Sequence, residues 1–173
     1  MSDPAFTDLN HISVATRDLD RAVRIWADRY GIGPWRVYTY DSTNMVASVD
    51  GEPTDFAMRV ALCQLGPHTR VEIIQPLDER SPYAHSLQQR GGADHLHHIR
   101  MDVEDYQSSV ERLERLDLGK VLAGTFQSGV DPDDPSKAIY FGTEADLGFV
   151  VELALLPPGL VLRAPDYIYP DGD

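Results

Sequence analysis

The chain has 173 residues, of which 42% are hydrophobic, a length that suits one well-buried core or two half-size modules sharing an interface. Its formal net charge is −13, with 15 basic residues against 28 acidic ones. Nucleic acid is therefore not an expected partner, because such binding depends on Lys and Arg neutralising phosphates.

Targeting and membrane signals are missing from the sequence. The first ten residues carry no basic start followed by an apolar run, and no window approaches the roughly 18 consecutive apolar residues of a membrane span. Cys63 is the single cysteine and lies in an apolar run, where we expect a buried structural thiol. We expect a soluble, cytoplasmic protein without a membrane partner.

The first half of the chain predicts the element order β, α, β, β, β. An alternating run over 9–16 is followed at 18–31 by apolar residues at helical spacing, with Gly31 as the stop. Three further strands are predicted at 34–41, 56–65 and 69–77, and a long loop at 41–54.

The second half predicts the same order again. After a connector whose first part, SPYAHSLQQ, has the features of a short helix, the chain predicts a strand at 96–103 and a helix at 105–119. Strands are then predicted at 120–126, 138–143 and 149–156. We expect an α+β protein of two tandem βαβββ modules, with the first module at 8–78, a connector at 79–94, the second module at 95–157 and a C-terminal tail at 158–173.

The duplication is visible in residues as well as in element order. Leu9-x-His11-Ile12 matches Leu96-x-His98-Ile99, and Val71-Glu72-Ile73 matches Val151-Glu152-Leu153. Side chains alternate between the faces of a strand, so each half presents one His and one Glu on the side away from its helix. His97 shares its face with apolar neighbours, which favours a packing or supporting role.

A carboxylate in the middle of an apolar strand is costly to bury unless it is paired or bound to a metal. Here this happens twice, at repeat-related positions. Two His and two Glu suit a borderline divalent ion, and two ligands from each half leave coordination positions for water or substrate. We therefore predict a catalytic metal site at His11, Glu72, His98 and Glu152, within a curved mixed sheet.

The segments LNHISVATRDLDRAVRIW, VEIIQPLDERSPYAHSLQQ, LHHIRMDVEDY and FVVELALLP resemble the vicinal oxygen chelate (glyoxalase/bleomycin resistance/dioxygenase) superfamily, and most of all its methylmalonyl-CoA epimerase branch. The resemblance covers roughly residues 8–156 and implies the glyoxalase-like fold. It implies that His11, His98 and Glu152 bind one divalent ion, commonly Co, Mn, Mg, Ni, Zn or Fe, with Glu72 as a further ligand. It also implies a small-molecule substrate and a homodimer.

The same resemblance implies an enzyme, a metal-dependent isomerase or epimerase that chelates a carbonyl or acyl-CoA substrate and acts through its enolate. The resemblance also implies that Asp55 holds the position of the family's general base. An equal alternative is that Asp55 is a turn residue that only caps the strand. Glu152 is a second candidate for proton transfer. The aromatic residues of 35–40 suit either a pocket for a bulkier substrate or the core.

Other functions stay open at this point: a glyoxalase-type lyase, an extradiol ring-cleaving dioxygenase, or a metal-free binding or resistance protein on the same scaffold. The ligand set separates them, because dioxygenases use a facial triad of two His and one carboxylate. Glu72, as a fourth ligand, favours the isomerase or lyase, although a Glu72 that points to solvent would remove this distinction. Whether the modules pair within or between chains is likewise open.

Overall fold

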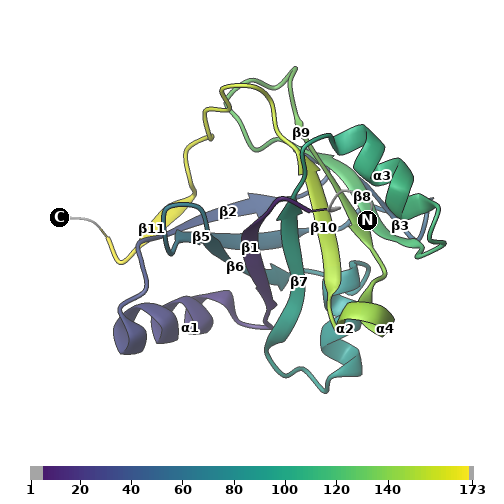
Figure 1. Cartoon of the computed structure of the whole chain (residues 1–173). Helices are drawn as coiled ribbons and strands as arrows, with labels where there is room; N and C mark the ends of the chain where they lie inside the picture. The colour runs from purple at the N-terminus through teal and green to yellow at the C-terminus, as the bar shows by residue number, and fades with distance from the viewer. Residues whose placement is uncertain (1–5, 172–173) are drawn as a thin grey trace.

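The computed structural model describes residues 6–171, and within them eleven strands join in one sheet, drawn in Figure 1. The strands are β1 (Asp8–Ala15), β2 (Trp35–Tyr40), β3 (Met45–Val49), β4 (Glu52–Pro53), β5 (Met58–Gln64), β6 (Arg70–Pro76), β7 (His95–Asp102), β8 (Lys120–Phe126), β9 (Ser136–Phe141), β10 (Val150–Leu155) and β11 (Tyr167–Tyr169). The helices are α1 (Leu19–Arg24), which continues as the π-helical turn η1 (Ile25–Arg29), α2 (Pro82–Gln89), α3 (Tyr106–Glu114) and α4 (Glu144–Leu147). The predicted α+β class with a mixed sheet is confirmed.

The two halves of the chain build the sheet in the same way. The first half contributes the order β2-β5-β6-β1 and the second β7-β10-β9-β8. In each half the first strand pairs in parallel with the last, β1 with β6 and β7 with β10. An antiparallel pairing of β1 with β7 joins the halves, so they pair within one chain.

A helix covers the outer face of each half. α1 begins at Asp18, whose carboxylate accepts a hydrogen bond from the Arg21 amide at 2.9 Å. Its buried Leu19 and Val23 pack against apolar residues of β5 and β6, among them Cys63, whose predicted burial is confirmed. Burial of this apolar stripe holds the helix on the sheet.

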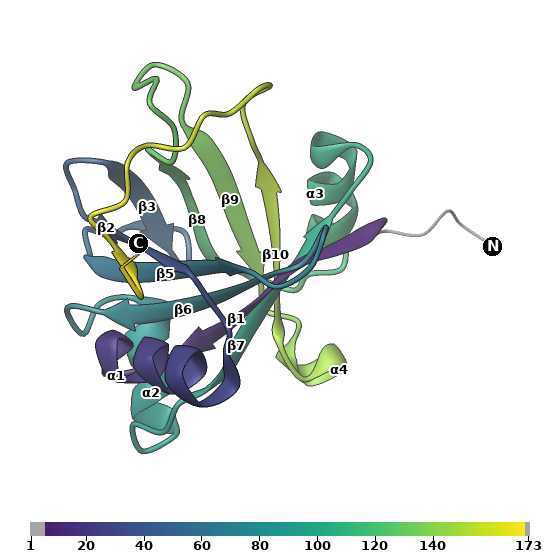
Figure 2. The same cartoon turned by 90° about the vertical axis from the view of Figure 1, so that its left-hand side faces the viewer.

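α3 repeats this arrangement on the second half. It begins at Asp105, which caps the Ser108 amide at 2.7 Å, and its buried Val110 and Leu113 pack on β9 and β10. Figures 1 and 2 show α1 and α3 on opposite flanks of the curved sheet. The inner face of the sheet is thereby left for a cavity.

The segment expected as a loop at 41–54 instead carries the strands β3 and β4. Met45 and Val49 are buried, and β3 pairs with β8 of the second half. A Cβ at Gly124 would lie 2.5 Å from the Val46 carbonyl oxygen, so this close pairing requires glycine. The pairing is between distant parts of the chain, which is why the Asp-, Gly- and Pro-rich sequence suggested only a loop.

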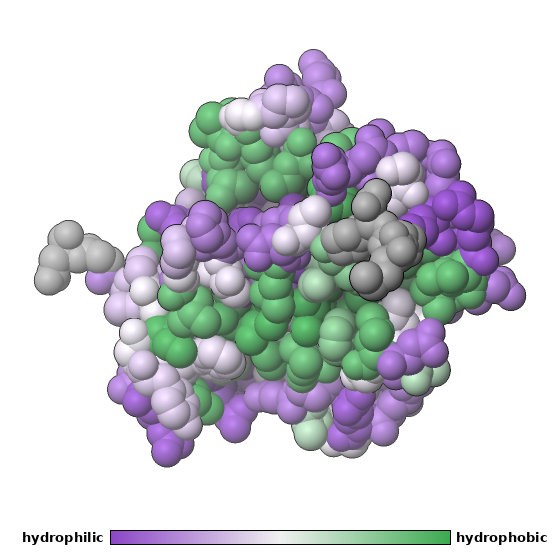
Figure 3. Space-filling model, viewed as in Figure 1, coloured by the Kyte–Doolittle hydropathy of each residue, from purple (hydrophilic) through white to green (hydrophobic). Residues whose placement is uncertain are grey.

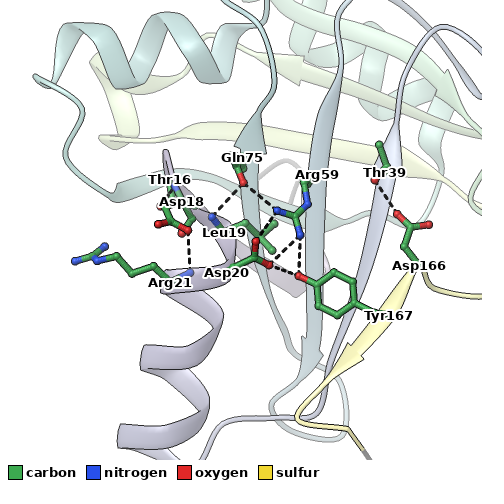
Figure 4. Close-up of polar contacts among 10 residues, drawn as sticks. All are labelled: Thr16, Asp18, Leu19, Asp20, Arg21, Thr39, Arg59, Gln75, Asp166 and Tyr167. Carbon is green, nitrogen blue, oxygen red and sulfur yellow. Dashed lines mark hydrogen bonds and ion pairs between the residues drawn. The ribbon is translucent and has the colours of Figure 1, made fainter.

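The C-terminal segment also adds a strand, because β11 pairs with β2. Figure 4 shows how it is held: Arg59 donates to Asp20 at 2.9 Å and to the Tyr167 hydroxyl at 2.8 Å, and that hydroxyl donates to Asp20. Thr39 donates to Asp166 at 2.7 Å. These contacts hold the C-terminal segment, which follows β10, against β2.

An apolar seam runs along β1 and β7 on the outer face, between α1 and α3. Ile12, Val14, Ile99 and Met101 point to this face and are only partly buried, and Figure 3 shows hydrophobic residues gathered there. Across residues 6–171, the helices are all too short or too polar to cross a membrane.

Candidate metal centre

Strand register places the four predicted ligands in two neighbouring rows of the sheet. His11 on β1 lies opposite Arg70 on β6 and Arg100 on β7. Ser13, two residues further along β1, lies opposite Glu72 and His98.

Glu152 of β10 lies opposite Arg100 and so continues the row of His11. The four predicted ligands therefore come from β1, β6, β7 and β10, the central strands of the sheet, and they point to its inner face.

The predicted ligand atoms converge on one point. Glu152 Oε2 lies 3.0 Å from His11 Nε2 and 3.1 Å from His98 Nε2. Glu72 Oε2 lies 3.5 and 3.3 Å from the same two nitrogens. The two nitrogens themselves are 3.3 Å apart, and all four side chains are buried.

This geometry fits a divalent cation. The Oε2 atoms of Glu72 and Glu152 are buried without an aligned hydrogen bond, although both approach the two imidazoles. Ligand atoms of His11, His98 and Glu152 lie within 4.8 Å of one another. Two nitrogens and two carboxylate oxygens are donors that Zn, Co, Fe and similar ions accept, and an ion at their centre would balance both buried charges.

The carboxylates and imidazoles perturb one another strongly. Burial alone would lower the pKa of His98, but its contacts with Glu152 and Glu72 outweigh burial and raise that pKa to about 9. Burial would raise the pKa of both Glu72 and Glu152, whereas the charges of His11 and His98 lower it below its usual range. The carboxylates are therefore ionised and ready to bind a cation.

Aromatic rings fix the orientation of His98. Its ring packs edge-on against Tyr140, with centroids 4.8 Å apart, and its Nδ1 lies 3.1 Å from His97 Nδ1. His97 in turn packs on Tyr83 at 4.8 Å, and burial holds the pKa of His97 well below its ordinary value. A neutral His97 thus touches the ring of a predicted ligand, which fits the supporting role expected from the sequence.

A cavity of about 110 Å³ opens over the group. Its polar lining includes His11, Glu72 and Glu152, with Arg70 and Arg100 beside them. Its apolar lining comes from the inner faces of both halves and from the segment after β10: Tyr38, Tyr40, Met58, Val60, Leu62, Ile74, Phe126, Ala138, Tyr140, Ala154, Leu156, Leu160 and Leu162. Of the aromatics singled out in the sequence, Tyr38 and Tyr40 line this cavity, while Trp35 is fully buried in the core under α1.

Asp55 is not brought to this group. It lies exposed in the connection between β4 and β5, next to the buried Phe56, and does not belong to the cavity lining. Its part in the chemistry stays a prediction.

Arg70 and Leu160 line the cavity but are not among the site residues predicted from the sequence. Arg70 is two residues before Glu72 in the same strand, so the alternation that placed Glu72 on the inner face also places Arg70 there. Leu160 belongs to a segment without periodic signal, and no sequence pattern predicts that its side chain lines the cavity.

Comparison with known proteins agrees with the resemblance seen in the sequence. The profile of the Glyoxalase/Bleomycin resistance protein/Dioxygenase superfamily matches residues 10–134. An ethylmalonyl-CoA/methylmalonyl-CoA epimerase of Cereibacter sphaeroides is 31% identical over 105 residues, which cover 61% of this chain and 67% of that protein.

Solved structures share the fold at lower identity. Methylmalonyl-CoA epimerase from Mycobacterium tuberculosis superposes with a TM-score of 0.61 at 21% identity, covering 91% of this chain and 93% of that one. A Streptomyces coelicolor methylmalonyl-CoA epimerase variant in complex with 2-nitronate-propionyl-CoA gives 0.60 at 16% identity, covering 90% and 99%. The predicted glyoxalase-like fold is confirmed, and the chain belongs to the Glyoxalase/Bleomycin resistance protein/Dioxygenase superfamily.

Proposed function

We propose that this chain is a metal-dependent epimerase that moves the proton on the carbon next to the carbonyl of a 2-substituted acyl-CoA. The observation that carries the proposal is the buried convergence of His11, Glu72, His98 and Glu152 at the wall of an apolar cavity. The epimerase relatives support the substrate class.

The four ligands would hold one divalent ion, whose identity among Co, Mn, Mg, Ni, Zn and Fe is open. When bound, such an ion supplies Lewis acidity that makes the proton next to a carbonyl easier to remove. His98, wedged between Tyr140 and His97, keeps its Nε2 directed at the centre. The apolar lining excludes water from the reacting carbon and receives its alkyl substituent.

Epimerisation needs a proton to leave one face of the carbon and return to the other. Glu152 lines the cavity with an ionised carboxylate, and we assign one of the two transfers to it. Asp55 remains our candidate for the second transfer, with the test given in the Discussion.

Deuterium exchange tests the proposal. In D2O, cobalt-loaded protein is expected to introduce deuterium at C2 of methylmalonyl-CoA and ethylmalonyl-CoA far faster than buffer, and chelator-treated protein and His98→Ala are expected not to. If no exchange occurs while iron(II)-loaded protein consumes oxygen with a catechol, the dioxygenase alternative replaces this proposal. Lyase activity would appear as turnover of a glutathione hemithioacetal instead.

The predicted homodimer and cytoplasmic location also belong to this proposal. The partly exposed seam of Ile12, Val14, Ile99 and Met101 supports the dimer, because a second copy would bury it. Sedimentation of the wild type beside Ile99→Asp is expected to show a dimer that the variant lacks, and a monomeric wild type would contradict it.

A further inference from the structure

Two arginines stand beside the candidate metal centre, and the proposed ion gives them no role. Register places Arg70 and Arg100 on either side of His11, and both side chains line the cavity. A guanidinium is a permanent cation that cannot ligate a metal ion and is repelled by one.

The fold neutralises only part of this positive charge. Arg70 donates to Asn10 Oδ1 at 2.9 Å, while an Arg100 nitrogen lies 3.7 Å from Asp102 Oδ1. Asn10 in turn donates to both carboxylate oxygens of Asp102, at 3.2 and 3.0 Å. Apart from the predicted ligands Glu72 and Glu152, one partly exposed carboxylate within the described residues, that of Asp102, therefore serves both guanidiniums.

Arg100 also has an unused donor. Its side chain is only 10% exposed, and its buried Nε has no hydrogen-bond partner among residues 6–171. Leaving a buried donor on a charged group unpaired is costly. A divalent ion would be balanced by Glu72 and Glu152, which leaves one net positive charge on the two arginines and Asp102.

We infer that Arg70 and Arg100 form a subsite for a carboxylate of the substrate, at the edge of the metal centre. Planar guanidiniums match the geometry of a carboxylate and bind it through paired hydrogen bonds. The inference rests on the proposed function and sharpens it: the enzyme selects acyl-CoA substrates with a free carboxylate on the reacting carbon, and these two residues make the selection.

A matched pair of thioesters isolates the carboxylate. Isobutyryl-CoA carries a methyl group where methylmalonyl-CoA carries its carboxylate, and the two are otherwise alike. Calorimetric titration of cobalt-loaded wild type is expected to show at least about tenfold tighter binding of methylmalonyl-CoA, the worth of one charge-assisted contact.

Arg100→Met and Arg70→Gln are each expected to reduce that preference to about twofold or less, with isobutyryl-CoA binding unchanged. Arg36→Met is the control and should keep the wild-type preference, because Arg36 is an exposed residue of β2 that does not belong to the cavity lining. Arg70 is only partly buried, so Arg70→Gln decides the matter if Arg100→Met fails to fold.

A preference that survives in the folded variants, or wild type that does not prefer methylmalonyl-CoA, would overturn the inference. Failure of the proposed function is distinguishable, because it would appear as an arginine-dependent preference without any deuterium exchange.

Discussion

The Nε2 atoms of His11 and His98 lie 3.3 Å apart, although 87 residues separate them in the chain. The antiparallel pairing of β1 with β7 brings them together, since each histidine is the third residue of its own repeat motif. Two imidazoles this close, with two carboxylates around them, form a ready ligand set when neutral. The internal duplication is thus the origin of the site.

Glu72 is the predicted ligand whose removal is most informative. Glu72→Ala is expected to weaken Co2+ binding by about tenfold or more, while Glu72→Gln should recover part of the affinity because its amide oxygen can also coordinate. Competition with a chromophoric chelator measures both, and Glu79→Ala on the exposed surface is the control. Unchanged affinity in Glu72→Ala would leave a triad of two His and one Glu and favour dioxygenase chemistry.

The exposed position of Asp55 makes its assignment as a base directly testable. If Asp55 moves one of the two protons, Asp55→Asn should slow epimerisation by about 10²-fold or more and still exchange deuterium into one epimer, because the other base is intact. Chiral analysis of the recovered thioester with mass detection separates the two events.

Asp50→Asn is the matched control for Asp55→Asn, since Asp50 lies in the same region with a positive φ of 50°, which Asn also adopts. An epimerisation rate of Asp55→Asn equal to that of the wild type would mean that Asp55 is only a turn residue.

Leu160 supplies an apolar wall of the cavity from the segment after β10. Leu160→Ala is therefore expected to lower kcat/KM for ethylmalonyl-CoA by about tenfold relative to methylmalonyl-CoA, because the longer alkyl group loses more contact. Leu116→Ala, at a solvent-exposed position beyond α3, should leave the ratio unchanged. Equal losses for both substrates would mean that Leu160 does not contact the substituent.

The contact of Asp20 with Arg59 and Tyr167 gives a pH dependence to the stability of the C-terminal segment. The hydrogen bond from Arg59 lowers the pKa of Asp20 from 3.8 to about 2. A lowered folded-state pKa stabilises the fold fully above pH 3.8, and this contribution disappears as the pH falls through 2.

Asp20→Asn should therefore lower the free energy of unfolding by about 0.2–1 kcal/mol at pH 7, the range of a partly exposed pair, and this effect should vanish as the pH falls below the folded-state pKa of about 2. Urea unfolding of both proteins across this pH range checks the sign. A difference that grows on acidification would refute it.

Sequence alone could place α1 with η1, α2 and α3, most strands and the four converging side chains, because each depends on local periodicity and the repeat, but it did not predict the short helix α4. Alternation in VEI and LHHIRMDV sufficed to direct Glu72 and His98 to the inner face. The same rule also directs Arg70 there, two residues before Glu72.

The remaining features depend on distant contacts. β3 pairs with β8 some eighty residues further along, and β11 pairs with β2 from the opposite end of the chain. The local composition of β3 and β11 does not indicate which strand each one pairs with. The family resemblance gives Asp55 a position in the chain, but a position in the chain does not determine how exposed the side chain is.

We propose that His11, Glu72, His98 and Glu152 hold a divalent ion, and the metal content of the purified protein decides whether they do. Purified, dialysed wild type and the control His85→Ala, altered on the exposed face of α2, should each contain about one divalent ion per chain. His98→Ala should contain almost none. Full occupancy in a folded His98→Ala would contradict the site.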